Sequence, residues 1–233
     1  MLNRHPLRGP KIHSTHSAEE DERLSLGEKA LFIEHPFDSS NHPKTGLTVP
    51  VTALGSSLTS LFYQAFVTGL HRPHKRPSAY QWESALIQTW DKLHPCPNPN
   101  CTQQWFIVLP EQTHCPFCHT AIKTPIPILT RRAQKRPGQW MRIGEIVIYD
   151  GQGLFKWHVF DNIFPGPSVD RTLQAYCVFY QEKWLLINQA LTSLTSADGH
   201  RVDINQAVEL KAGAPIRLSQ EAHGCLVEVW ANT

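Results

Sequence analysis

The sequence predicts a multidomain α+β protein in which a helical region, a zinc ribbon and an antiparallel β-sandwich follow one another along the chain. Apolar residues recur at helical spacing over residues 57–93, and four of the six cysteines lie within residues 96–118. Seven or eight short strand-like runs separated by turn residues fill the chain from residue 125 onward. These observations divide the chain into residues 1–50, 51–93, 94–122 and 123–233.

Residues 1–50 form the first segment, which is rich in His, Pro and Ser and has little apolar periodicity. Residues 26–32 are the one place where a short helical turn is predicted. We therefore expect an irregular segment that packs against something the chain lacks, because loops of this length are uncommon within a compact domain.

Two helices are predicted next. Apolar residues three and four apart indicate an amphipathic helix over residues 57–70. A second helix begins at Ser78, whose hydroxyl can form a capping box with Gln81. We expect it to end at His94-Pro95 and to present one apolar face, made of Ala79, Trp82, Leu86, Trp90 and Leu93.

The cysteines follow the pattern Cys96-x4-Cys101-x13-Cys115-x2-Cys118. Cys115 and Cys118 form a tight knuckle, and a strand-like run joins it to the looser first pair. Two such knuckles on a hairpin are typical of a zinc ribbon, in which four thiolates hold a structural Zn²⁺ and leave no open position for catalysis.

Other interpretations of the cysteines stay open. The four could be unrelated buried residues, or Cys115 and Cys118 could form a redox dithiol, which leaves the first pair unexplained. One of three flanking histidines could replace a thiolate: His94, His114 or His119. Cys177 and Cys225 lie in strand-like surroundings and are predicted to be core residues.

The C-terminal region has the pattern of an antiparallel β-sandwich. Residues 180–184 indicate a tight hairpin. Residues 131–138 form a basic loop, which we interpret as a solvated hairpin tip, with a phosphate-binding patch as the alternative. The predicted strands span residues 125–129, 140–149, 154–160, 173–180, 184–187, 206–210, 215–218 and 225–230.

Charge and hydropathy exclude several classes of function. The net charge of +2 gives no reason to expect a nucleic-acid partner. The apolar run at residues 105–109 is far too short to span a bilayer, and residues 1–6 lack the apolar stretch of a secretion signal. We expect a cytoplasmic protein with reduced thiols and no membrane association.

Residues 54–93 resemble the end of a protein-kinase C-lobe. Arg76 matches the arginine that pairs in kinases with the glutamate of the Ala-Pro-Glu motif. Leu2 and residues 5–9 resemble the segment after the central helix of that lobe. The chain also resembles bacterial kinase-like proteins with a zinc-ribbon tail, because residues 31–36 are followed by the two helices and the ribbon. The string that carries the likeness is Leu61-Phe62, Ala65-Phe66, Gly69-Leu70, Pro73, Arg76-Pro77-Ser78-Ala79, Trp82 and Ala85-Leu86.

Residues 125–231 resemble a degenerate forkhead-associated (FHA) β-sandwich, a likeness carried by residues 181–188 and 199–218. An FHA site holds phosphothreonine with a loop arginine, a serine and an asparagine. Ser168 and Arg171 are the nearest candidates, but their spacing departs from the family pattern.

The catalytic half of the kinase pattern is absent from this sequence. It has no Gly-rich loop, no Val-Ala-Ile-Lys strand, no His-Arg-Asp loop, no Asp-Phe-Gly and no Ala-Pro-Glu. We therefore assign no catalytic and no nucleotide-binding residue, and we expect no phosphate transfer by this chain.

Two functions remain. The chain could be the non-catalytic C-terminal regulatory or interaction portion of a bacterial serine/threonine-kinase-like protein, with an upstream kinase half or a phosphoprotein as partner. Alternatively, it is an independent zinc-ribbon plus β-sandwich module that binds protein in preference to nucleic acid. Arg76 discriminates between them, because an unpaired buried arginine is costly. We therefore expect Arg76 to be exposed, to be paired locally, or to be satisfied by a missing partner chain.

Overall fold

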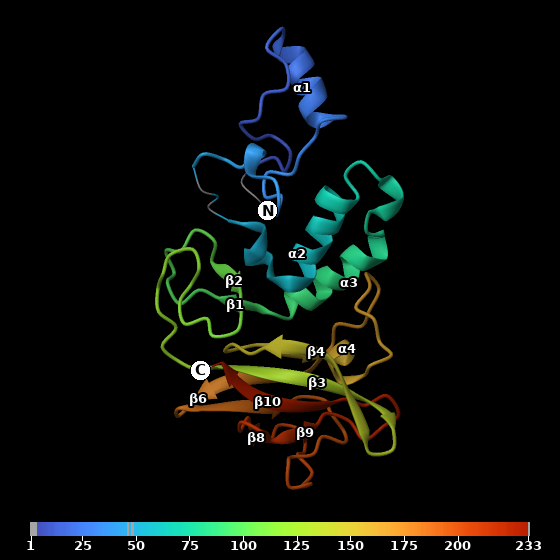
Figure 1. Cartoon of the computed structure of the whole chain (residues 1–233). Helices are drawn as coiled ribbons and strands as arrows, with labels where there is room; N and C mark the ends of the chain where they lie inside the picture. The colour runs from blue at the N-terminus through green and yellow to red at the C-terminus, as the bar shows by residue number, and fades with distance from the viewer. Residues whose placement is uncertain (1–3, 46, 48, 233) are drawn as a thin grey trace. The chain divides into compact units, whose positions relative to one another are not determined.

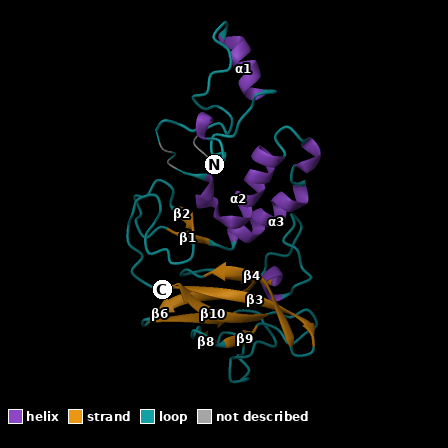
Figure 2. Ribbon diagram, in the orientation of Figure 1, coloured by secondary structure: helices purple, strands orange, loops and turns teal. Residues whose placement is uncertain are grey.

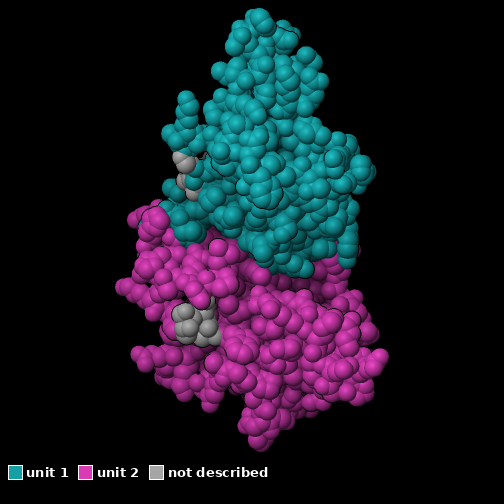
Figure 3. Space-filling model, viewed as in Figure 1, with its two compact units in different colours: residues 1–90, 101–103, 116–118 teal, residues 91–100, 104–115, 119–233 magenta. Residues whose placement is uncertain are grey.

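A computed structural model of the 233-residue chain describes residues 4–45, 47 and 49–232. The fold is mixed α+β with antiparallel sheets (Figures 1 and 2). Two compact units divide the chain (Figure 3): residues 1–90 with 101–103 and 116–118, and residues 91–100, 104–115 and 119–233. Leu2, which contributes to the kinase likeness, lies outside the described residues.

The N-terminal segment contains a helix that the sequence interpretation missed. Helix α1 (Ala18–Leu26) begins at Ser17, whose side chain accepts a hydrogen bond from the Glu20 backbone N–H at 3.0 Å. Acidic residues in the first turn favour this helix further. The helical turn predicted at residues 26–32 is wrong, because the helix ends at Gly27, whose backbone is not helical. Short 3-10 turns η1 (Ser39–Asn41) and η2 (Val51–Leu54) follow.

Both predicted helices of the next region are present. Helix α2 (Gly55–Tyr63) continues as a π-turn, η3 (Gln64–Thr68), and a 3-10 turn, η4 (Pro73–Lys75), precedes α3 (Ala79–Trp90). The predicted capping box is confirmed: Ser78 N–H donates to Gln81 Oε1 at 2.8 Å, and Gln81 N–H donates to Ser78 Oγ at 3.3 Å.

The apolar face predicted for α3 is only partly right. Trp82 packs edge-on against Phe62 of α2, with ring centroids 5.3 Å apart, and Ala85 is the buried residue of the helix. Leu86 and Trp90, predicted on the same apolar face, are 49% and 75% exposed, so part of that face is left uncovered. Helix α3 ends at Trp90 rather than at His94-Pro95, because Leu93 belongs to a strand instead.

The second unit begins with that strand. Strands β1 (Leu93–Pro95) and β2 (Trp105–Ile107) form an antiparallel pair in which Leu93 lies opposite Ile107. Asp91 accepts a hydrogen bond through its backbone carbonyl from the Val147 N–H at 2.7 Å. This bond fixes the start of β1 relative to β4, and the cysteine segment follows directly after β1.

Two four-stranded antiparallel sheets follow (Figure 1). The first has the order β4-β3-β10-β9, with β3 (Ile126–Arg136), β4 (Gln139–Val147), β9 (Pro215–Arg217) and β10 (Leu226–Asn232). The second has the order β5-β6-β7-β8, with β5 (Gly153–Phe155), β6 (Leu173–Tyr180), β7 (Lys183–Asn188) and β8 (Ala207–Glu209).

One apolar core receives side chains from both sheets, as expected for a sandwich. Leu129 and Val229 enter it from the first sheet and Leu186 from the second. The other buried members are Ile146, Ile148, Leu154, Val159, Ala175, Cys177, Leu191, Leu194, Val202, Leu210, Ile216, Leu218 and Val227.

Two strand predictions need correction. Strand β3 runs through residue 136, so residues 131–136 are not a loop, and the turn lies at Pro137-Gly138, where Gly138 has φ 77°. The basic side chains are compatible with a strand because Arg132 pairs with Glu228 at 2.8 Å and Arg131 donates to backbone carbonyls. The strand predicted over residues 154–160 stops at Phe155, where helix α4 (Lys156–Val159) begins.

Within the described part of the chain, no helix combines the length and the apolar character that crossing a bilayer demands.

Candidate metal centre

The first cysteine knuckle follows β1. The Cys96 N–H donates to the Gln104 carbonyl at 2.6 Å, which closes the loop between the two strands. The Asn98 N–H approaches Cys96 Sγ at 3.4 Å, and the Asn98 side chain accepts from the Asn100 N–H at 2.9 Å. An amide that donates to sulfur stabilises the thiolate form, which is the form that binds a metal.

The second knuckle is Cys115-Pro116-Phe117-Cys118. The Cys115 N–H donates to the Thr120 carbonyl at 2.9 Å, and the His119 N–H donates to the Cys115 carbonyl at 3.0 Å. His119 takes φ 57°, a left-handed conformation that turns the chain back immediately after Cys118. The short loop can therefore direct both of its thiols to the same side.

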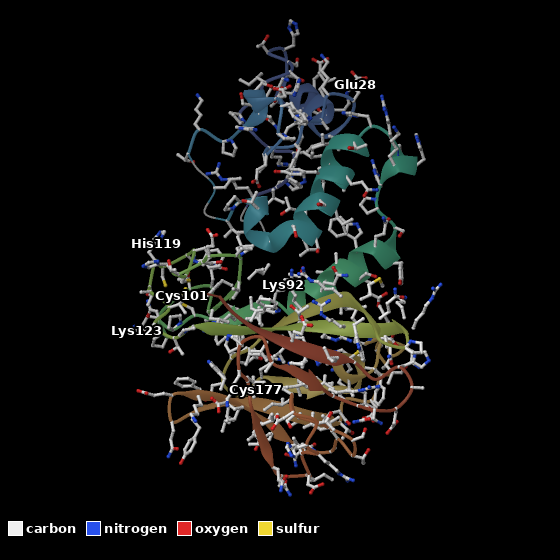
Figure 4. The ribbon with its side chains drawn as sticks, turned by 60° about the horizontal axis from the view of Figure 1, so that its bottom comes forward. Glu28, Lys92, Cys101, His119, Lys123 and Cys177 are labelled. Carbon is white, nitrogen blue, oxygen red and sulfur yellow. The ribbon has the colours of Figure 1, made fainter. Side chains whose placement is uncertain are left out.

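The two knuckles bring all four predicted cysteines together. The Sγ atoms of Cys96, Cys101, Cys115 and Cys118 lie within 4.8 Å of one another. Sulfur ligands of a tetrahedral ion with bonds of about 2.3 Å are separated by about 3.8 Å, so these four atoms need only small movements to hold a metal. Cys101 and His119 lie in this segment, whereas Cys177 lies among the strands of the sandwich (Figure 4).

The donor set is made of sulfur alone. Among residues 4–45, 47 and 49–232, this is the one cluster of three or more His, Cys, Asp or Glu side chains with metal-binding geometry. Four thiolates suit a soft or borderline ion in a tetrahedral site and suit Ca²⁺ or Mg²⁺ poorly. The structure brings the four cysteines together, which the interpretation as unrelated buried residues did not predict.

The flanking histidines are not members of the cluster. The half-buried His94 ring packs against Phe106 and Tyr149, and its Nδ1 lies 2.7 Å from the Pro95 carbonyl oxygen. Loss of solvent lowers the pKa of His94. His114 Nδ1 lies 2.9 Å from Thr113 Oγ1. Neither ring takes the place of a thiol.

No family model, no curated protein and no solved structure matches this chain.

The two remaining cysteines are core residues, as predicted. Cys177 and Cys225 are fully buried, and burial raises the pKa of both thiols. Arg131 Nη2 lies 4.0 Å from Cys225 Sγ and opposes part of that rise. Neither thiol has the exposure or lowered pKa of a reactive cysteine.

Sequence reasoning did not find a buried pair between Asp91 and His158. Asp91 Oδ1 lies 3.2 Å from His158 Nε2, and the two side chains are 10% and 3% exposed. His158 Nδ1 accepts the Phe155 N–H at 3.0 Å, so Nε2 carries the proton that is donated to Asp91. No local signal reveals this pair, because its members are 67 residues apart.

Arg76 has partners within the chain. Its Nε donates to the Gly69 carbonyl at 3.0 Å, and its Nη2 donates to the Leu70 carbonyl at 2.8 Å. These carbonyls follow the end of η3, where a cation is favoured by the helix dipole. Of the outcomes considered for Arg76, two hold together: the residue is exposed, and its guanidinium is paired locally.

Asn188 is a second polar group that the sequence did not single out. It is fully buried, and its Nδ2 donates to the carbonyls of Leu191 and Val202, both at 2.8 Å. Its Oδ1 accepts the Leu191 N–H at 2.8 Å. One side chain thereby fixes both ends of the β7–β8 connection.

Proposed function

We propose that this chain is a non-catalytic interaction module stabilised by one structural Zn²⁺, and that it serves as the C-terminal regulatory portion of a bacterial serine/threonine-kinase-like protein. The observation that carries the proposal is the cluster of four thiols and no other ligand. Four sulfur ligands complete a tetrahedral shell, so the ion has no position left for a reacting water.

Zinc is the ion that this site suits best. It has no redox chemistry and is compatible with the reduced thiols of the cytoplasm, where we place the protein. A tetrahedral set of four thiolates also accepts iron, which gives a visible absorption that zinc lacks. Metal content therefore distinguishes the two ions directly.

Metal analysis of the whole chain, purified without added metal, is expected to give about one zinc per chain. Incubation with radiolabelled ATP, Mg²⁺ and a general protein substrate is expected to give no phosphate transfer, because the sequence lacks the phosphate-binding lysine and the metal-binding acids. Absence of zinc would contradict the ribbon. Transfer that survives stringent purification would contradict a non-catalytic role.

The independent module is the second candidate, and Arg76 favours it. The Arg76 guanidinium donates to the Gly69 and Leu70 carbonyls, so this arginine requires no carboxylate from a kinase half. The two candidates share the zinc ribbon and the FHA-like sandwich. They differ in whether α3, with exposed Leu86 and Trp90, meets a kinase domain.

Cross-linking separates these candidates. A photoreactive phenylalanine analogue in place of Trp90 is expected to cross-link to a protein kinase if the chain is a regulatory portion. The same analogue in place of Tyr180, which is 59% exposed on the sandwich, is the matched control. Cross-links from position 90 that contain no kinase would favour the independent module.

A further inference from the structure

A cavity of about 470 Å³ lies in the second unit, where the connections that follow α4, β7 and β9 come together with the start of β6. Its volume is typical of cavities that hold a small ligand or a side chain of a partner. Neither FHA candidate, Ser168 or Arg171, lines it. Its walls include Lys156, Phe160, Gln174, Thr192, Ser193, Ser219 and Glu221.

The positive charge of this cavity is already neutralised. Lys156 is the one Lys or Arg among the lining residues, and its Nζ lies 2.7 Å from Asp170 Oδ2. Asp170 also accepts hydrogen bonds from the N–H and the hydroxyl of Thr172. The Lys156 ammonium and these bonds hold the pKa of Asp170 well below its usual range. An anionic ligand would have to compete with a carboxylate that is held in place.

Two side chains on the cavity wall have hydrogen-bond acceptors that no donor of the described residues satisfies. Gln174 is 7% exposed, and its Nε2 donates to the Thr172 carbonyl at 3.0 Å, which leaves Oε1 without a donor among the described residues. Glu221 lines the same cavity, and its carboxylate has no ion-pair partner within the described part of the chain.

Two hydroxyls add to this set. Ser193 Oγ and Ser219 Oγ lie 3.3 Å apart. Each also accepts a backbone N–H, from Gln220 at 3.0 Å and from Glu221 at 3.1 Å. Both oxygens therefore lie in fixed positions. The cavity thus offers an amide oxygen without a donor in the described part of the chain, a carboxylate and hydroxyls in fixed positions to a ligand rich in donors.

We propose that this cavity binds the guanidinium group of an arginine side chain presented by a partner peptide. Arginine carries a permanent charge and five N–H donors in a planar fork, which can reach an amide oxygen and a carboxylate together. The compact ammonium of lysine matches such separated acceptors less well. The inference rests on the proposed interaction function and names the chemistry of the partner.

The test uses the whole zinc-loaded chain labelled with ¹⁵N and three capped peptides that differ at one position: arginine, citrulline and phosphothreonine. Citrulline keeps the shape of arginine but lacks its charge. The arginine peptide is expected to shift the amide resonances of Gln174, Ser193 and Ser219 in a saturable way. The citrulline peptide is expected to bind at least about tenfold more weakly, the loss of roughly one charged contact.

Two variants complete the test. Glu221→Gln keeps the size of an exposed side chain and is expected to weaken arginine binding about tenfold. Glu182→Gln, in the β6–β7 turn at the other end of β6, is the matched control and is expected to bind as the unaltered chain does. Saturable shifts from the phosphothreonine peptide alone, equal binding of citrulline, or no shift at the cavity would overturn the proposal. Zinc content measured on the same sample reports separately on the proposed function.

Discussion

The ribbon and the β-sandwich use the same side chain in two different ways. In the ribbon, four thiols converge within 4.8 Å of one another, and the buried apolar residues beside them are few: Phe106, Ile107 and Val108. In the sandwich, Cys177 is one member of a core to which both sheets contribute. A short hairpin buries too little apolar surface to fold alone, so we propose that sulfur serves there as a metal ligand, whereas a large core uses sulfur as a small apolar group.

The largest expected difference between the two regions is in their response to the loss of one thiol. Cys101→Ser is expected to abolish metal binding and unfold residues 93–122, because the binding free energy of a structural zinc, about 10 kcal/mol or more, is also the folding free energy of its site. Cys177→Ser is expected to keep the metal and cost about 1–3 kcal/mol for a hydroxyl in an apolar core. Metal content and hydrogen exchange resolved along the chain measure both effects.

Equal zinc content in Cys101→Ser and the unaltered chain would show that the cluster does not hold the ion. A chelator supplies the same test without a substitution, since it should increase exchange in the ribbon and leave β3–β10 protected.

In the sandwich, a buried polar residue takes the stabilising role that we propose for a metal in the ribbon. Asn188→Ala is expected to lower the free energy of unfolding by about 3–5 kcal/mol, because it removes three hydrogen bonds and leaves buried carbonyls without donors. Gln189→Ala, at the exposed neighbouring position, is the control and should change it by less than about 0.5 kcal/mol. Urea unfolding followed by tryptophan fluorescence measures both. Similar losses from the two variants would mean that Asn188 does not fix the connection.

Some parts of this architecture could be predicted from the sequence because their signals are local. The cysteine spacing predicted that four thiols come together, and strand-like runs between turn residues predicted most strands. Helix α1 has a single buried residue, Leu24, so it lacks the apolar periodicity from which a helix can be predicted. Ser17 and Glu20 nevertheless have the pattern of a capping box. Leu86 and Trp90 have helical spacing but stay exposed, since periodicity indicates which residues share a face and not whether that face is covered.

The features that could not be predicted join distant residues. The buried pair of Asp91 and His158 forms only when the sheets form. The same holds for the cavity, where Lys156 comes together with the residues after β9. The basic run at residues 131–136 was interpreted as a loop because charge suggests solvent. Its partners, Glu228 and the carbonyl of Trp157, lie far away in the sequence.

Titration of the core thiol Cys177 is a smaller effect. Burial raises the pKa of Cys177 above its ordinary value of 9.0, so above pH 9 the unfolded chain loses a proton that the folded chain keeps. Stability contributed by this thiol is therefore complete below pH 9 and falls as the pH rises, by about 1.4 kcal/mol at pH 10. Urea unfolding of the sandwich at pH 8 and pH 10 should show this fall, and Cys177→Ala should reduce it. An identical pH dependence in the two proteins would contradict the burial effect.

The smallest expected effect comes from backbone conformation and applies to both regions. Glu182 has φ 61° in the β6–β7 turn and His119 has φ 57° in the ribbon, where glycine is preferred. Glu182→Gly and His119→Gly are each expected to stabilise their region by about 1 kcal/mol. The first should raise the urea midpoint of the sandwich and the second the affinity for zinc. A loss of stability in either variant would show that its side chain makes a contribution larger than the relief of strain.

The contacts of Asn188 also indicate where this protein can tolerate an insertion. Because the Asn188 side chain hydrogen-bonds to both Leu191 and Val202, the ends of the connection between them are fixed. Leu194 within this connection still lies in the core, and an exposed excursion follows it. The outermost part of this excursion is the exposed Asp198-Gly199 turn, which is closed by a hydrogen bond from the Ser196 N–H to the His200 carbonyl. A fluorescent protein or an affinity tag spliced between residues 198 and 199 should therefore leave the register of β7 and β8 unchanged.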